Sequence, residues 1–411
     1  MALVMPRRLP VSPALAHAAL GPSARALTAF LLGVAWWTYP RFVPLCAVTP
    51  ALFWRARSRA EAWAVGAAYQ LGATMQLADG AAHYLQMSER EGLLMVGLGA
   101  AAIGAGWAAS WVDVRSASPL RRSAAFLLWL GITTLPCALG SLMVAHPLLS
   151  AGFLMPGTGW LGLWALVVLM AAASQGWAMG GLVALALLAC ARGTSMESPL
   201  ASGWLEAVET NLLPSDGSAD VQGELRVALA SQRAMRRTSA QVVVLPEGAA
   251  GVWTDEMRRL WAGTAARFRA QGRTFLVGAS LERADGTYDN AVVALGAAGE
   301  QSEVQRLPIP GAMWRPWTGG APGSFRAHLW DDGVLELHGR RLGILVCWEG
   351  ALVAPALLSM AAGAEALALV ANHAWVDDGG LPTVVAARAW GALFGVPVVV
   401  ARNASSSLEG M

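Results

Sequence analysis

The sequence of 411 residues contains no lysine, because all 29 of its basic residues are arginine. Any chemistry that requires a lysine amine is therefore excluded. Charge of either sign is also scarce, at 14% of residues, whereas 55% of residues are hydrophobic and the mean hydropathy is +0.47. This composition is too apolar for a single soluble globule, so we expect part of the chain to lie in a membrane.

Nucleic acid and metal are not indicated as partners. The net charge is only +2 and no basic stripe stands out, which argues against a nucleic-acid surface. The spacing of the four cysteines fits neither a zinc site nor a disulfide framework. Cys46, Cys137 and Cys190 lie in apolar segments, where cysteine usually packs as a small hydrophobe. With no metal cluster and no phosphate-binding loop in the sequence, we expect no cofactor.

The composition changes near residue 193, after about seven apolar blocks. The blocks cover residues 25–39, 41–54, 62–80, 92–112, 123–146, 158–173 and 176–192. A membrane-spanning helix needs about 20 apolar residues, and only the third, fourth and fifth blocks meet that length well. The sequence therefore predicts a polytopic α-helical membrane domain over residues 1–192, with an uncertainty of one or two in the number of spans.

Arginine placement predicts the orientation of this domain. Connections rich in arginine alternate with connections that are poor in it, and the rich side is expected to be cytoplasmic. Seven crossings from an internal N-terminus would place the rest of the chain in the periplasm. The sequence thus predicts a multi-pass protein of a bacterial inner membrane, with its C-terminal domain in the periplasm. If one of the last two blocks does not cross, that domain is cytoplasmic.

Residues 193–411 alternate short apolar runs with helical stretches. We expect strands at 204–213, 241–248, 274–282, 288–296, 366–376 and 396–403, a hairpin that turns at Gly339, and helices at 219–237 and about 382–394. Continuous apolar strands of this kind are buried on both faces of a sheet. The sequence therefore predicts a layered α/β domain.

Two of these strands end in a reactive side chain with a glycine nearby. "VVVLPEG" carries Glu247, and "GILVCWEG" carries Cys347. If both strand ends face one cleft, Cys347 is a candidate nucleophile and Glu247 its base, giving a thioester with an acyl or amide carbon. Backbone N–H groups freed at the turn can receive the developing negative charge. The alternative is that the two residues are unrelated structural positions.

Several blocks together resemble the nitrilase (carbon–nitrogen hydrolase) superfamily, which has a Glu–Lys–Cys triad on an αββα fold. They are "LPEG", "YDNAVVAL", "CWEG", "ANHAWVDD" and "AARAWGALFGVPVVVARNAS", in this order. A nitrilase-like domain behind a membrane domain resembles the apolipoprotein N-acyltransferase branch. The layout and "RLPIPGAMWRPW" are most similar to the TraB-type conjugal transfer family.

The resemblance implies a membrane-anchored amidase or N-acyltransferase that acts through a thioester on Cys347, with Glu247 as base, in plasmid conjugal transfer. It implies a membrane phospholipid or an amide as substrate, and other proteins of the conjugation apparatus as partners.

The triad lysine has no match in this chain. The corresponding stretch, "SEVQRLPIPG", places Gln305 or Arg306 there, depending on one gap. Arg306 can hold an oxyanion but cannot give up a proton at working pH, or it can simply pair with a carboxylate. The family's supporting Phe-Gly-Glu is replaced by "PGAMW", for which Glu349 is a candidate substitute. These departures favour a second interpretation, a non-catalytic nitrilase-fold membrane component of the conjugation apparatus.

The remaining candidates follow from the same resemblance. Asn372 and Trp375 match a family block and are expected to shape the pocket. His373 lies between them, as a pocket residue or as a structural histidine. The segment 311–330 is rich in tryptophan and contains Met313, so it is either a lid that leans on the bilayer or a segment packed on the domain's own surface.

Overall fold

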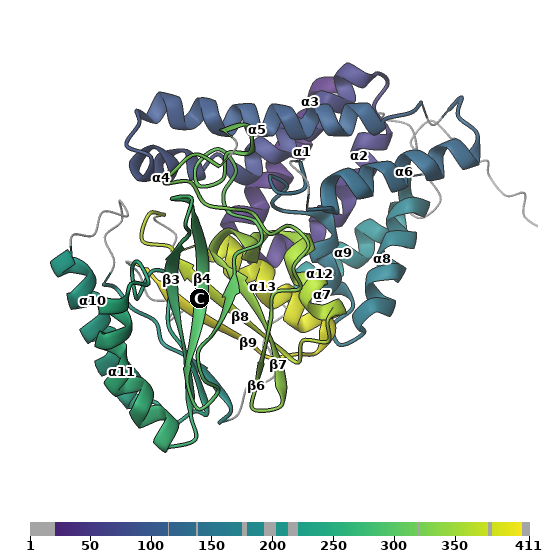
Figure 1. Cartoon of the computed structure of the whole chain (residues 1–411). Helices are drawn as coiled ribbons and strands as arrows, with labels where there is room; N and C mark the ends of the chain where they lie inside the picture. The colour runs from purple at the N-terminus through teal and green to yellow at the C-terminus, as the bar shows by residue number, and fades with distance from the viewer. Residues whose placement is uncertain are drawn as a thin grey trace, which may run out of the picture.

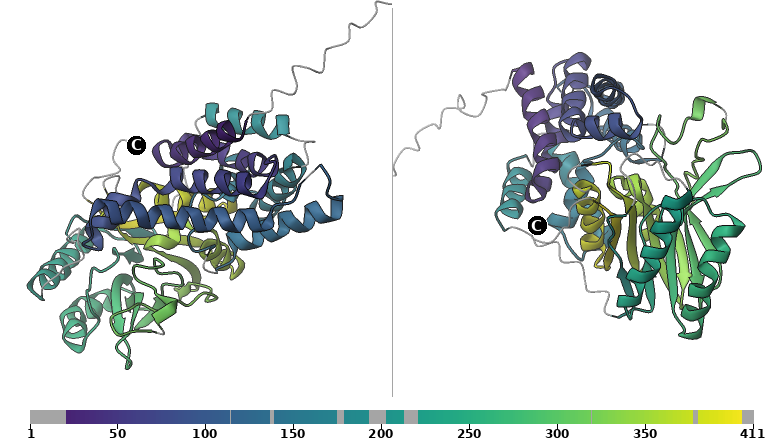
Figure 2. Two further views of the ribbon diagram at one scale, coloured as in Figure 1. Left: turned by 90° about the horizontal axis from the view of Figure 1, so that it is seen from above. Right: turned by 90° about the vertical axis from the view of Figure 1, so that its left-hand side faces the viewer.

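The computed structural model describes residues 21–113, 115–136, 139–174, 179–192, 203–212, 221–318, 320–376 and 380–404. Within them the chain forms a helical half, purple to blue in Figure 1, and an α/β half, green to yellow. The right-hand view of Figure 2 shows the helical half lying against the yellow, C-terminal side of the α/β half. The active-site candidates lie in the α/β half, close to this junction.

The helical half is a bundle of mostly short helices. They are α1 (Pro22–Thr38), α2 (Thr49–Trp54), α3 (Arg59–Thr74), α4 (Leu77–Tyr84), α5 (Glu89–Ser110), α6 (Pro119–Thr134), α7 (Ala151–Leu154), α8 (Gly159–Ser174) and α9 (Met179–Arg192), with 3₁₀ turns η2 (Pro40–Val48) and η3 (Pro147–Ser150). Helices α1 and α3 touch backbone to backbone, because a Cβ at Gly72 would lie 2.2 Å from the Phe30 carbonyl oxygen. This close contact requires glycine.

The predicted polytopic membrane domain is wrong. Among the described residues only α5, with 22 residues, is a helix long and apolar enough to cross a membrane. Proline divides two of the other blocks: the block 41–54 becomes η2 and α2 around Pro44 and Pro50, and α6 ends just before Pro136. Helices α8 and α9, with 16 and 14 residues, fall short of a span. The periplasmic placement assumed seven crossings and loses its basis.

The α/β half contains two sheets. The first has the order β1 (Leu205–Ala207), β2 (Val242–Val244), β3 (Thr274–Glu282), β4 (Tyr288–Gly296), β5 (Gln301–Val304), and the second β6 (Val334–Leu337), β7 (Arg340–Val346), β8 (Ala366–Asn372), β9 (Val398–Asn403). Strands β1, β2 and β3 are parallel, as are β7, β8 and β9, while the pairs β3–β4, β4–β5 and β6–β7 are antiparallel. The carboxyl ends of β2 and β7, one strand from each sheet, are therefore the places where a shared site can form.

Helices cover the outer face of each sheet. Helices α10 (Val221–Ala234) and α11 (Asp255–Ala270) lie on the first sheet, and α12 (Val353–Ala361) and α13 (Leu381–Phe394) on the second (Figure 1). Between the sheets, Val244, Leu276 and Ile344 belong to one apolar core. The runs expected at 274–282 and 288–296 are β3 and β4, and the hairpin turns at Gly339. Helices α11 and α12 and strand β5 were not predicted from the sequence.

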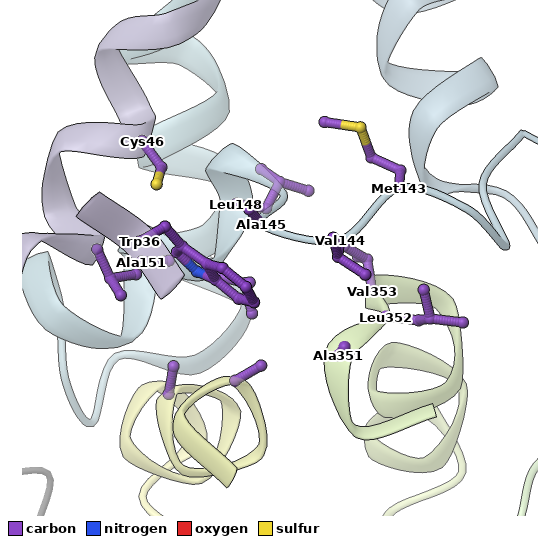
Figure 3. Close-up of a cluster of buried hydrophobic side chains, with 14 of the residues drawn as sticks. Trp36, Cys46, Met143, Val144, Ala145, Leu148, Ala151, Ala351, Leu352 and Val353 are labelled. Atoms are coloured by element: carbon purple, nitrogen blue, oxygen red, sulfur yellow. The ribbon is translucent and has the colours of Figure 1, made fainter. Parts of the chain in front are cut away.

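The helical half and the α/β half share one continuous apolar cluster. Figure 3 shows Trp36, Val144 and Leu148 of the helical half on one side of this cluster, and Ala351, Leu352 and Val353 of the α/β half on the other. Helices α7 and α13 are in backbone contact, since a Cβ at Gly152 would lie 2.0 Å from the Ala389 carbonyl oxygen. Separating the halves at residue 193 would therefore expose a large apolar surface.

Candidate active site

Cys347 lies at the point where the apolar strand β7 turns into the 3₁₀ turn η6 (Cys347–Ala351). Its backbone has φ of 52°, in the left-handed region that non-glycine residues rarely adopt. Such strain persists only where the surrounding structure imposes it, and it is concentrated at functional sites. The turn is held by Trp348, whose indole N–H donates to the Ser141 carbonyl oxygen of the helical half at 2.8 Å. The sulfur thus lies on a strained turn that is anchored to the helical half.

Glu247 follows β2 and lines the same cavity as Cys347, close enough to the thiol for each group to shift the pKa of the other. Its Oε1 accepts from Asn290 Nδ2 at 2.6 Å, and its Oε2 accepts from the Asn372 backbone N–H at 2.8 Å. Behind it, a Cβ at Gly278 of β3 would lie 2.5 Å from the Glu247 Cα, so only glycine fits there. Two neutral donors and the thiol therefore surround the carboxylate.

Burial controls the electrostatics of the pair, because none of the described residues that line the cavity is a cation. Burial raises the pKa of the Glu247 carboxyl above its usual range, and the hydrogen bond from Asn290 opposes this. Burial, and then repulsion from Glu247, raise the pKa of the Cys347 thiol well above its ordinary value. The backbone N–H of Trp348 acts in the opposite direction by hydrogen-bonding the sulfur. The pair therefore holds its proton, and thiolate forms only as that proton moves to the carboxylate.

The side chains of Gln305 and Arg306 point in opposite directions. Gln305 Oε1 accepts from Asn290 Nδ2 at 2.9 Å, and Gln305 Nε2 donates to the Val346 carbonyl oxygen at 3.0 Å. Gln305 is therefore joined to Glu247 through Asn290. The Arg306 guanidinium turns away into a buried site, where it donates to the carbonyl oxygens of Ile344 and Pro355.

Glu349 is fully buried behind the cavity. Its carboxylate lies 3.3 Å from the Arg306 guanidinium and accepts the backbone N–H groups of Arg306, Leu307 and Val346. These bonds tie the segment after β5 to the turn that carries Cys347. Glu349 and the Arg306 side chain do not line the cavity. Their geometry is that of a structural ion pair.

The three candidates after β8 differ in their surroundings. Asn372 lines the cavity and, besides its bond to Glu247, accepts from Asn403 Nδ2 at 3.0 Å. Trp375 also lines the cavity. The ring of His373 lies deeper, with Nε2 3.0 Å from the Thr383 hydroxyl, and it does not line this cavity.

A cavity of about 440 Å³ opens in front of Cys347 and Glu247. Its wall on the side of α4 and α5 is apolar and includes Leu77, Leu85, Met95 and Val96, whereas α3 contributes the polar side chains of Gln70 and Thr74. Met313 of the segment 311–330 also lines it, whereas Trp317 and Trp330 are 71% and 65% exposed. The cavity is therefore enclosed jointly by the two halves.

Two polar residues of this region were missed at the sequence level. Asn290 appeared only as part of a family block, although it stands at a buried position of β4. Glu224, in the first turn of α10, lines the cavity but resembles an ordinary helix-terminal carboxylate. Among the described residues, no group of three His, Cys, Asp or Glu side chains gathers in a geometry that holds a metal.

A layered α/β domain with a strained cysteine, a buried glutamate and an apolar cavity defines a candidate cysteine-dependent acyl-transfer or amide-cleaving site. The chain is 32% identical over 358 residues to the conjugal transfer protein TraB of Agrobacterium fabrum, covering 84% of this chain and 83% of that protein. It is 29% identical to a probable conjugal transfer protein TraB of Sinorhizobium fredii, covering 87% and 91%. The chain belongs to the TraB family of conjugal transfer proteins.

No family model matches the chain. Among solved structures, an amidase of the nitrilase superfamily from Nesterenkonia is 18% identical with a TM-score of 0.38, covering 50% of this chain and 79% of that one. A carbon–nitrogen hydrolase from Helicobacter pylori is 16% identical with a TM-score of 0.35, covering 50% and 75%. At these TM-scores the fold description rests on the sheet topology above.

Proposed function

We propose that this protein is an amidase or N-acyltransferase that works through a thioester on Cys347, with Glu247 as its base, in plasmid conjugal transfer. The observation that carries the proposal is that Cys347 and Glu247 line the wall of one cavity, close enough for each to shift the pKa of the other. The family relationship supports the role in conjugation.

The contacts of the pair supply the first half of the reaction. The thiol proton passes to the Glu247 carboxylate while the sulfur attacks the donor's carbonyl carbon and forms a C–S bond. The carbonyl oxygen takes the electron pair and is stabilised by the Trp348 backbone N–H. The bond to the leaving group then breaks, and the leaving group takes the proton from Glu247.

The second half regenerates the thiol. Water or an amine attacks the thioester carbon and gives a proton to Glu247. The C–S bond breaks, and the proton returns from Glu247 to the sulfur. Asn290 and the Asn372 backbone N–H hold the carboxylate throughout, so the same group acts first as base and then as acid.

The apolar wall formed by α4 and α5 supports a fatty acyl donor such as a membrane phospholipid. Exposed leucines on the helical half, including Leu93, Leu94 and Leu98 of α5, support association with a bacterial inner membrane. The boundary between the helical and catalytic modules lies between residues 192 and 193. The helical module also binds other proteins of the conjugation apparatus.

The test uses the full-length protein and p-nitrophenyl esters of acetate and of a long-chain fatty acid. We expect release of p-nitrophenolate and a mass increase of one acyl group on the peptide that contains Cys347. Cys347→Ala should abolish both signals, Glu247→Gln should slow acylation on the order of 100-fold or more, and the matched Cys190→Ala should behave as wild type. A folded wild-type protein without acyl-Cys347 would contradict the enzymatic proposal.

A second candidate is a non-catalytic component of the conjugation apparatus. The observation that favours it is the raised pKa of both Cys347 and Glu247 without a cation beside them in the described residues. Plasmid mating frequency separates the two functions. A non-catalytic component keeps its mating frequency in Cys347→Ala and Glu247→Gln, whereas an enzyme loses it in both.

A further inference from the structure

The described residues that line the cavity carry negative charge without a balancing cation. They include the carboxylates of Glu224 and Glu247 but no arginine, lysine or histidine. A partly enclosed cleft lined by charges of one sign concentrates ligands of the opposite sign. The cavity should therefore attract cationic groups and repel anionic ones.

Glu224 stands at a defined place in this cavity. It belongs to the first turn of α10, and the backbone N–H of Val252 lies near enough to its carboxylate to lower its pKa. The same carboxylate packs on Gly251, where a Cβ would lie 2.6 Å from Glu224 Oε1. Gly251 and Val252 are joined to Ser280 of β3, whose backbone N–H donates to the Gly251 carbonyl oxygen at 2.8 Å. All four residues line the cavity, so the backbone of the α/β half fixes the carboxylate there.

The Glu224 carboxylate is partly buried, and the described residues provide no ion-pair partner for it. A carboxylate taken from water without a cation loses solvation energy, which a cationic ligand would restore. The desolvation raises the pKa of Glu224, in agreement with its place in the cleft. Glu247, by contrast, is engaged by the thiol and two N–H donors.

We propose that Glu224 is the specificity residue for a cationic, amine-bearing acceptor. The Glu224 carboxylate binds the positive charge of the acceptor and does not exchange a proton with it. This inference rests on the proposed acyl transfer. The apolar wall of α4 and α5 then receives the acyl donor, while Glu224 and the backbone of Gly251 and Val252 receive the acceptor.

The first experiment measures the charge preference of the cavity and does not require turnover. Three methanethiosulfonate reagents, cationic ethylammonium, neutral methyl and anionic sulfonatoethyl, modify Cys347 in the full-length protein, and peptide mass spectrometry resolves this site from the other cysteines. Wild type should react faster with the cationic than with the anionic reagent. In Glu224→Gln the cationic-to-neutral rate ratio should fall roughly fivefold, the order expected for one charge in a partly solvated cleft. Glu282→Gln, an exposed carboxylate at the end of β3, is the matched control and should leave the ratio unchanged.

The second experiment measures the acceptor preference. With a p-nitrophenyl ester as donor, the acyl-enzyme partitions between hydrolysis by water and aminolysis by a cationic dipeptide amide. Glu224→Gln should lower the aminolysis-to-hydrolysis ratio about fivefold.

The outcomes separate this inference from the proposed function. An unchanged labelling ratio in Glu224→Gln, or an equal fall in Glu282→Gln, overturns the role of Glu224 even if Cys347 is acylated. Failure of Cys347 to be acylated in a protein that retains the Glu224-dependent labelling ratio refutes the enzymatic proposal instead.

Discussion

Placing a lysine at position 305 tests whether the missing cation controls the reactivity of Cys347. Gln305 Oε1 and Glu247 Oε1 bond the same Asn290 nitrogen at 2.9 and 2.6 Å, so they lie no more than about 5.5 Å apart. An ammonium at this distance, with an effective dielectric constant of about 20, stabilises a negative charge by roughly 3 kcal/mol, or about two pKa units. Gln305→Lys should therefore lower the pKa of Glu247 by about two units. It should also lower the pKa of the Cys347 thiol, because the added cation offsets the repulsion that Glu247 exerts on the thiolate.

The assay is the pH dependence of Cys347 alkylation by iodoacetamide, followed on the peptide by mass spectrometry. The midpoint is the quantity to compare, because the intrinsic nucleophilicity of a thiolate falls with its pKa. Gln305→Met, uncharged and of similar size, serves as the control and should leave the midpoint near that of wild type. If Gln305→Lys folds, as shown by its thermal unfolding, and its midpoint does not move, then residue 305 does not act on the thiol and the inferred geometry is wrong.

Three further perturbations follow from the site. Glu349→Gln breaks the buried pair with Arg306 and should cost about 3–5 kcal/mol of unfolding free energy in urea titrations, whereas the exposed Glu256→Gln should change stability little; equal effects would refute the structural role. Gly278→Ala should displace Glu247 and reduce turnover of p-nitrophenyl esters at least tenfold while the protein stays folded. Full activity would show that the close backbone contact is not required. Because the folded state raises the pKa of Glu247, its contribution to stability is complete below the unfolded pKa of about 4.3 and is lost as pH rises through the folded value. The thermal unfolding temperature of wild type should therefore fall from pH 5 to 8 by more than that of Glu247→Gln. Parallel pH curves for the two proteins would contradict the sign.

The strand-end residues of the site were accessible from the sequence because a buried strand has a simple pattern. An apolar run that stops at a polar residue and a glycine marks a strand end, and this pattern led to both Glu247 and Cys347. The structure places both side chains at the wall of one cavity. The choice between Gln305 and Arg306 was not accessible, because neighbouring residues of an extended segment point to opposite sides and one gap reverses the assignment.

The helical half shows the limit of composition. A helix buried against other helices and a helix in lipid are both apolar, so hydropathy alone identified blocks but not their environment. Length and proline decided the outcome, since α6 ends before Pro136 and the block at 41–54 is broken by Pro44. Glu224 was missed for a related reason: a carboxylate in the first turn of a helix is common, and only the three-dimensional cavity distinguishes this one.

The indole bond from Trp348 to the carbonyl of Ser141 has a practical consequence for work on this protein. A fragment that begins after the last helix of the N-terminal half would keep both sheets yet lose the anchor of the turn that presents the sulfur. Such a fragment would also uncover the apolar faces of α12 and α13. Inactivity of that fragment would therefore report a released turn rather than an incompetent cysteine.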